Sequence, residues 1–287
     1  MTDHSIWIVE YGFIDRFPAS NLFAAQPNEG HRRMPYCFGV VRSADRVILV
    51  DTGFHDPAMH ERLALKYGEG NVWADPVDVV RRCGVGPDEV DVVVLTHAHF
   101  DHAGRVAGFP RADVVIQSHE LEALRTAEAR GPRFEFLVRS SQKDLAEHLD
   151  GRPSGTVTLA RGSHQVCDGV SVLPAHDTHT PGSQIVVVEN ERDGPWVFAG
   201  DNMYSYENVE GLHFDGVLAP IAMSTGSPTR WIDFMDETLS SVGGDVNRLL
   251  PFHESRVWER FPSAQHADGL HIAEVSLAGG HDSILRL

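Results

Sequence analysis

Short apolar runs that stop abruptly at polar residues constrain the fold of this chain more than any other feature. The runs are rich in Val, Ile and Leu, which is typical of strands buried on both faces of a sheet. They are RVILVD (46–51), VDVVVLTH (90–97), ADVVIQSH (112–119), GVSVLPAHDTH (169–179), SQIVVVE (183–189), PWVFAGD (195–201) and NRLLPFHE (247–254). Five of them lead into Asp51, the cluster from His97 to His102, the pair His176 and His179, Asp201 and His253. Because strand ends meet at one edge of a sheet, we expect these polar side chains to surround one point.

Helical patterns lie between some of these runs. The segments DPVDVVRRCG (75–84) and SPTRWIDFMDETLSSVGG (227–244) begin with a capping residue followed by Pro and end in Gly, as helices commonly do. The second segment has apolar residues at helical spacing, namely Trp231, Phe234, Met235, Leu239 and Val242. We interpret these residues as core, because a helix packed on a sheet needs one apolar face. Strands interleaved with helices predict an α/β protein whose helices cover the outer faces of its sheets.

The length of 287 residues suits one large α/β domain spanning 1–287. The stretch from about 120 to 162 has no strong strand signal, and we predict that it is a helical and loop insertion in the frame. The segment 19–36 lacks periodicity, and we predict a loop that closes over a substrate pocket.

Composition excludes several classes of function. The formal net charge of −17 disfavours a nucleic-acid partner, because binding a phosphate backbone needs clustered Lys and Arg. No stretch approaches the roughly 20 apolar residues needed to cross a bilayer, and the first residues lack a signal-peptide pattern, so we expect a cytoplasmic protein without a membrane partner. Cys37, Cys83 and Cys167 are far apart in the sequence, and we predict buried, reduced thiols.

The segment THAHFDHAG (96–104) concentrates residues that bind metals. Alternate side chains at a strand end point the same way, which places His97 and His99 together, and a turn then carries Asp101 and His102 to a second position. Imidazoles and carboxylates are ligands for Zn²⁺, Mn²⁺ and Fe²⁺. Packing alone gives no reason to gather so many costly polar groups, so the segment predicts two adjacent metal positions.

Five motifs in order along the chain resemble those of the metallo-β-lactamase superfamily. They are VDTG (50–53), THAHFDHAG (96–104), HTPGS (179–183), GDNMY (200–204) and PFHE (251–254). The resemblance implies an αββα sandwich with a dinuclear metal site at the edge of the two sheets.

The resemblance also implies a ligand set. His97, His99 and His179 would bind the first ion, Asp101, His102 and His253 would bind the second, and Asp201 would bridge both. Asp51 would be an outer carboxylate that orients ligands, and His176 a neighbour rather than a ligand, because the family's ligand directly precedes Thr-Pro-Gly. His253 departs from the family pattern, since it lies in FHES where many relatives have GHD. The implied cofactors are two divalent ions, Zn²⁺ first, with Mn²⁺, Fe²⁺ and Co²⁺ also accepted by these ligands.

The stretch GDNMYSYENVE (200–210) is similar to the N-acyl homoserine lactonase pattern. It places Tyr204 three residues after Asp201, where a phenol could stabilise an oxyanion. The expected activity is therefore hydrolysis of an N-acyl homoserine lactone or another small lactone. A metal-bridging hydroxide would attack the carbonyl, and Asp101 would carry a proton to the leaving alkoxide. We expect a small-molecule substrate and, as a family-level assembly, a homodimer.

Other reactions remain open at this point. Small esters, amides, thioesters and halogenated compounds suit the same two ions. A mononuclear iron sulfur dioxygenase needs fewer ligands than the chain offers, and a metal-binding sensor without turnover gains no support from a complete ligand set. A Ser/His/Asp enzyme is a weaker rival, because the sequence has no G-x-S-x-G turn. Candidate walls of the substrate pocket are Phe54, Phe100, Phe109, Phe134 and Phe136.

Overall fold

A long antiparallel hairpin of β1 (Ser5–Pro18) and β2 (His31–Arg42) forms the middle of the larger of two sheets. The chain is described here by a computed structural model that covers residues 3–27, 29–68 and 70–285. Both faces of the hairpin are covered, since Ile6, Trp7, Ile8 and Val9 are all at most 2% exposed. The hairpin is therefore a core element, although its sequence mixes apolar and polar residues.

The larger sheet has nine strands and combines antiparallel and parallel pairs. Its order is β13 (Ser263–Gln265), β14 (His271–Ser276), β1, β2, β3 (Val47–Val50), β5 (Val92–Val94), β6 (Asp113–Gln117) and β7 (Val157–Ala160), with β4 (Val72–Trp73) paired to β1. The strands β3, β5, β6 and β7 run parallel. Their carboxyl ends consequently lie at the same edge.

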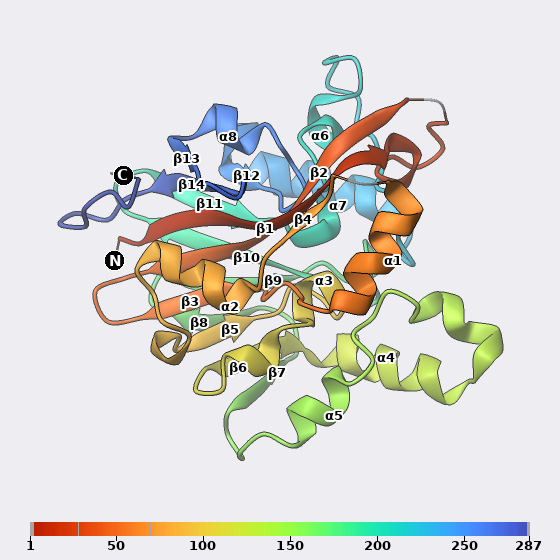
Figure 1. The fold of residues 1–287 in the computed structure, drawn as a ribbon, viewed down its shortest axis with the longest axis horizontal. Helices are drawn as coiled ribbons and strands as arrows, with labels where there is room; N and C mark the ends of the chain where they lie inside the picture. Colours follow the sequence, from red (N-terminus) through yellow and green to blue (C-terminus); the bar gives the residue numbers. More distant parts are fainter. Residues whose placement is uncertain (1–2, 28, 69, 286–287) are drawn as a thin grey trace.

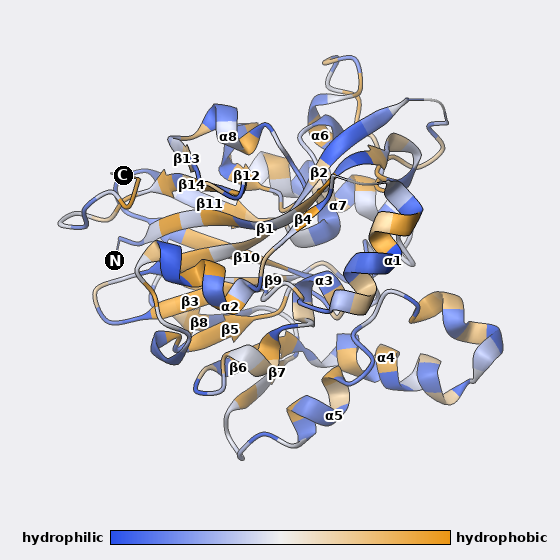
Figure 2. Ribbon diagram, viewed as in Figure 1, coloured by the Kyte–Doolittle hydropathy of each residue, from blue (hydrophilic) through white to orange (hydrophobic). Residues whose placement is uncertain are grey.

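The smaller sheet has five strands in the order β12 (Leu249–Leu250), β11 (Gly194–Phe198), β10 (Gln184–Asn190), β9 (Val170–Pro174) and β8 (His164–Cys167). The apolar side chains of the two sheets form a continuous core. In Figure 2, hydrophobic residues are concentrated along the strands, whereas the helices alternate between hydrophobic and hydrophilic residues.

Helices surround the two sheets. They are α1 (Pro57–Tyr67), α2 (Pro76–Val79), α3 (Phe100–Ala103), α4 (Ser118–Ala129), α5 (Leu145–Asp150), α6 (Glu207–Glu210), α7 (Pro228–Ser241) and α8 (Val257–Arg260). Figure 1 shows α1 and α2 in front of the larger sheet and α7 on the far side of the molecule. The predicted αββα sandwich is confirmed. None of the helices in the described part of the chain is long and apolar enough to cross a membrane.

The capping residues predicted at the starts of two helices form the expected hydrogen bonds. Asp75 accepts a hydrogen bond from the Val77 N–H at the start of α2, and Ser227 accepts one from Arg230 at the start of α7. On α7, Trp231, Phe234 and Met235 are buried against the core. These capping side chains satisfy backbone donors that the first turn of a helix leaves free.

Several sequence-based expectations need correction. The segment 19–36 is not one loop, because it contains a short 3₁₀ helix at Ala19–Asn21 and the first part of β2; its residue 28 lies outside the described residues. The segment 120–162 contains most of α4, then α5, but also β7, which pairs with β6. Cys37 and Cys83 are buried as predicted, whereas Cys167 is only partly buried.

Candidate metal centre

The polar residues predicted to converge do so at one edge of the sandwich. His97 and His99 follow β5, His179 follows β9, and Asp201 lies in a 3₁₀ helix, Gly200–Asn202, just after β11. Asp101 and His102 lie in α3, and His253 follows β12. All seven side chains are buried and form two groups, each with ligand atoms within 4.8 Å of one another.

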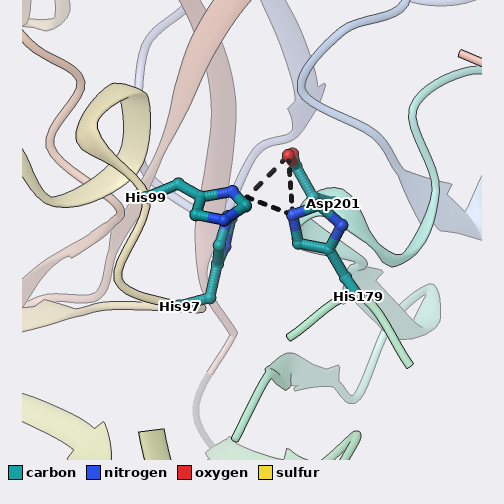
Figure 3. A group of neighbouring side chains, drawn as sticks. All are labelled: His97, His99, His179 and Asp201. Atoms are coloured by element: carbon teal, nitrogen blue, oxygen red, sulfur yellow. Dashed lines mark hydrogen bonds and ion pairs between the residues drawn. The ribbon is translucent and has the colours of Figure 1, made fainter. Parts of the chain in front are cut away.

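The first group consists of His97, His99, His179 and Asp201. Figure 3 shows the three imidazoles and the carboxylate pointing toward one another, with His97 and His99 on one segment of the chain and His179 and Asp201 on two others. The His179 Nε2 atom lies 3.0 Å from His99 Nδ1 and 3.3 Å from Asp201 Oδ2. The His97 Nε2 atom lies 3.7 Å from the same carboxylate oxygen.

The second group consists of Asp101, His102 and His253. The Nε2 atoms of His102 and His253 are each 3.8 Å from Asp101 Oδ2. They are also 2.9 Å and 3.1 Å, respectively, from Asp201 Oδ1. One oxygen of Asp201 thus faces the first group and the other oxygen faces the second, which is the geometry of a bridging carboxylate.

Asp51 supports both groups, the second directly through His102 and the first through Thr96. Its carboxylate accepts hydrogen bonds from the Thr96 N–H and hydroxyl, both at 2.7 Å, and lies 2.7 Å from His102 Nδ1. The Thr96 hydroxyl is also 3.0 Å from His97 Nδ1. Asp51 itself adopts φ 65°, a left-handed conformation that is costly for a residue with a side chain. Backbone strain of this kind is common at functional sites.

Backbone groups orient other members of the centre. The His253 Nδ1 atom lies 2.8 Å from the carbonyl oxygen of Pro35, and the Tyr11 hydroxyl donates to the Asp101 carbonyl at 2.8 Å. The first of these contacts directs His253 Nε2 toward the cluster. Histidines that bind metals almost always have their other nitrogen fixed in this way.

Burial sets the protonation of the first group. Desolvation lowers the pKa of His97 well below its ordinary value, and it lowers the pKa of His99 to about 4 and of His179 to about 3. Neighbouring histidines add to the effect at all three positions. The three imidazoles are therefore neutral near pH 7, which is the form that binds metal.

In the second group, neighbouring carboxylates favour the protonated form of His102. Burial alone would lower the pKa of His102, but the carboxylates of Asp201, Asp51 and Asp101 outweigh burial and raise that pKa well above its ordinary value. Burial opposes ionisation of Asp201, yet His102 and His253 hold its pKa well below the ordinary range. A positive charge is accordingly favoured between His102 and Asp201.

The chemistry of the centre fits metal ions. Among the described residues, no hydrogen-bond partner is available to Nε2 of His97, His102 or His253, or to Oδ1 of Asp201. When Nδ1 of His102 and of His253 carries the hydrogen that Asp51 and Pro35 accept, Nε2 of each ring and Asp201 Oδ1 face one another as acceptors at 2.9 Å and 3.1 Å. Such pairs of acceptors need a proton or a metal ion between them. Divalent ions bound by imidazoles and carboxylates fit both groups.

A cavity of about 360 Å³ opens beside the two groups, and His99, Asp101 and Asp201 form part of its wall. The remaining wall is largely apolar or aromatic and includes Phe17, Met34, Tyr36, Met59, Leu63, Tyr67, Phe100, Tyr204 and Met223. Lys66 and Arg139 also line it. The volume and lining are those of a site for a small molecule.

Tyr204 forms part of the cavity wall next to His179. Its side chain is buried, lines the cavity, and has its hydroxyl 3.5 Å from His179 Nδ1. The hydroxyl donates to the Ala222 carbonyl at 3.1 Å, so its one hydrogen has a protein partner in this state. Burial raises the pKa of Tyr204 well above its ordinary value, and the phenol therefore stays protonated.

His176 does not join either group, and its ring lies 5.2 Å from that of His119. Of the five phenylalanines proposed as pocket walls, only Phe100 lines the cavity beside the centre. Phe54 and Phe109 are core residues instead. Phe134 lies beneath Arg130 and Phe136 is 55% exposed, so both belong to the surface.

Two residues near the centre escaped the sequence analysis. Tyr36 lines the cavity, and its ring lies 5.0 Å from that of His253. Glu120 is buried and accepts hydrogen bonds from Ala98 and from the loop after His179. Each is a single residue in a segment without a recognisable motif, so only its contacts with residues distant in sequence draw attention to it.

Comparison with known proteins was made by sequence and by structure. The model of the metallo-beta-lactamase superfamily matches residues 37–253. An N-acyl homoserine lactonase from Bacillus sp is 25% identical over 222 residues, covering 74% of this chain and 82% of that protein. The N-acyl homoserine lactonase AttM of Azorhizobium caulinodans is 25% identical over 198 residues, covering 64% of this chain and 66% of that protein.

Solved structures show the same fold. A mutant of AiiA from B. thuringiensis, with N-decanoyl-L-homoserine bound at its active site, has a TM-score of 0.68 at 21% identity, covering 91% of this chain and 97% of that one. The dizinc lactonase AidC, in complex with a product, has a TM-score of 0.61 at 13% identity and covers 97% of both chains. At these identities the likeness establishes the architecture and leaves substrate to the residues of the site.

Proposed function

We propose that this chain, which belongs to the metallo-β-lactamase superfamily, is a two-metal hydrolase that opens the ring of a small lactone. N-acyl homoserine lactones are the first candidates, because the curated relatives carry that name. The observation that carries the proposal is the position of Asp201, whose two oxygens face two separate groups of histidines beside a cavity of small-molecule size.

The residues would divide between the two ions as the groups divide. His97, His99 and His179 would hold one ion, and Asp101, His102 and His253 the other, with Asp201 shared. Zn²⁺ is our first choice of metal. When bound, the ions supply Lewis-acid polarisation of the ester carbonyl and a water molecule of lowered pKa.

The protein's own groups would bind and orient the substrate. Tyr204 would turn its hydroxyl from the Ala222 carbonyl toward the substrate and donate a hydrogen bond to the oxyanion that forms at the carbonyl carbon. Rotation of a phenolic hydrogen needs no movement of the ring, which is fixed by burial. Tyr36 and Phe100 would cover the ring of the substrate and exclude bulk water.

Asp101 would manage the proton of the leaving group. Its carboxylate lines the cavity, and burial together with nearby Asp201 raises its pKa. A carboxylate of raised pKa could accept the proton that the attacking water gives up and deliver it to the alkoxide that leaves when the ring opens. No covalent intermediate with the protein is required.

The experiment is proton release from a panel of homoserine lactones of different acyl length and other small lactones, using metal-loaded protein and a chelated control. The proposal expects chelator-sensitive ring opening, with the acyl preference identifying the substrate. Failure to open any lactone, together with turnover of an amide, thioester or halogenated compound, would replace the lactone with that substrate. Oxygen consumption with a single bound iron would instead indicate the sulfur dioxygenase.

A further inference from the structure

Glu120, the third residue of α4, is a buried carboxylate that the proposed chemistry leaves unused. It is 4% exposed and lies outside both groups of candidate ligands. A buried carboxylate is costly unless charged partners or several hydrogen bonds compensate for lost hydration. The groups that donate hydrogen bonds to Glu120 therefore indicate its role.

The partners of Glu120 belong to the two loops that supply the histidines of the first group. The Ala98 N–H, between His97 and His99, donates to Glu120 Oε1 at 2.9 Å. The Thr180 hydroxyl and the Gly182 N–H, both in the loop after His179, each donate to Oε2 at 2.8 Å. One side chain thus ties together two loops about 80 residues apart in sequence.

The loop after His179 is shaped to accept this carboxylate. A side chain on Gly182 would lie 2.1 Å from the backbone nitrogen of Glu120, so only glycine allows the approach. Thr180 gains further order because its N–H donates to the Ser183 hydroxyl at 2.8 Å. The loop and the start of α4 therefore fit together as one unit.

Glu120 has no corresponding contact with the second group. His102 is held by Asp51, and His253 by the Pro35 carbonyl. Asp51 contacts the second group directly through His102 and reaches His97 of the first group through Thr96. Glu120 therefore supports the histidine loops of the first group alone, whereas Asp51 influences both groups.

We infer that Glu120 is a positioning residue that fixes the separation of His97, His99 and His179, and so sets the affinity of the first metal ion selectively. The inference rests on the two-ion centre of the proposed function but not on the identity of its substrate. Loss of an outer hydrogen-bond partner typically weakens metal binding about 10- to 100-fold. The second ion should be much less affected.

The test is a Zn²⁺ titration of the metal-free protein against a competing chromophoric chelator, which resolves two binding steps. Glu120→Gln should weaken one step about 10- to 100-fold and leave the other nearly unchanged. Thr180→Val, which removes one of the three donors, should weaken the same step by less. Because binding is read directly, the outcome does not depend on whether any lactone is hydrolysed.

Glu10→Gln is the matched control. Glu10 is also buried, forms an ion pair with Arg33 and accepts a hydrogen bond from the His271 N–H, with no contact to either histidine loop of the first group. It should lose thermal stability while keeping both binding steps. The variant His253→Ala removes a ligand of the second group and leaves the first group complete. If adding Glu120→Gln to His253→Ala weakens the remaining binding step by the same factor, the affected step belongs to the first group.

Wild-type affinity of both steps in Glu120→Gln would overturn the inference, as would equal weakening of the two steps. Should Glu120→Gln fail to fold, Thr180→Val decides: selective weakening of one step supports the inference, and two unchanged steps contradict it. Loss of lactone turnover with normal metal binding would count against the proposed substrate alone.

Discussion

His102 Nδ1 lies 2.7 Å from Asp51 Oδ2, and both side chains are essentially inaccessible to solvent. This contact directs His102 Nε2 at Asp201, the carboxylate shared by the two groups. The same Asp51 carboxylate binds the backbone of Thr96, so it couples a ligand in α3 to the end of β5. One outer carboxylate therefore influences the geometry of both groups.

Asp51→Asn should lower metal affinity about 10- to 100-fold, because an amide cannot accept every hydrogen bond that the carboxylate accepts. Metal content after dialysis against a weak chelator measures the effect. Asp150→Asn, which removes an exposed partner of Arg125, is the control for loss of a negative charge. Equal metal content in the two variants would show that Asp51 does not support the centre.

Tyr204→Phe should keep both metal ions and lower kcat about 100-fold, because one donor to the oxyanion is lost. Tyr206→Phe is the matched control, since Tyr206 is also buried but does not line the cavity. Steady-state kinetics and metal analysis of the same samples give the result. If the two variants retain equal kcat, Tyr204 serves only to pack against His179.

Arg139 should bind the carboxylate that ring opening creates. It lines the cavity, and its positive charge contributes to the lowered pKa of His99. Arg139→Gln should weaken inhibition by the ring-opened acid about 2- to 5-fold, as expected for an exposed charge pair. Arg133→Gln, in the same segment but away from the cavity, should leave the inhibition constant unchanged; an identical change in both variants would rule out a specific contact.

His60 should make stability depend on pH. Burial, helped by the neighbouring His55, lowers its pKa to about 4 from the ordinary 6.5. Between these values the unfolded chain takes up a proton that the folded chain does not, so the stability present above pH 6.5 decreases as pH falls toward 4.

His60→Phe removes this titration while keeping a ring next to Trp73, on which His60 stacks at 5.0 Å. The fall in Tm from pH 7 to pH 5 should therefore be smaller in the variant than in the wild type. Both proteins contain the same metal centre, so the difference between them isolates His60. Parallel curves of Tm against pH would contradict the prediction.

The apolar runs predicted the strands that approach the centre, because β3, β5, β9 and β11 are short, largely buried and lie just before the polar residues of the site. The αββα sandwich followed from the resemblance carried by five motifs. The predicted ligands come together for the same reason, since their positions at strand ends fix where they meet.

Other parts were not predictable from local patterns. The β1 and β2 hairpin contains Glu10, Arg33 and register shifts, which interrupt strand periodicity. Glu10 and Arg33 form an ion pair at 2.6 Å that only the folded sheet reveals. Glu120 likewise reads as an ordinary residue of a helix, because its partners are contributed by loops distant in sequence.

The most direct test of the central claim measures bound metal and the rate of proton release from a lactone in the same samples, before chelation, after chelation and after restoring Zn²⁺. Two ions per chain in active protein, loss of both ions and activity on chelation, and recovery of both on reloading are the predicted results. Asp201→Asn should lose metal and turnover together, since its carboxylate faces both groups. A rate that survives complete removal of the metal, or full activity in metal-free Asp201→Asn, would contradict the account.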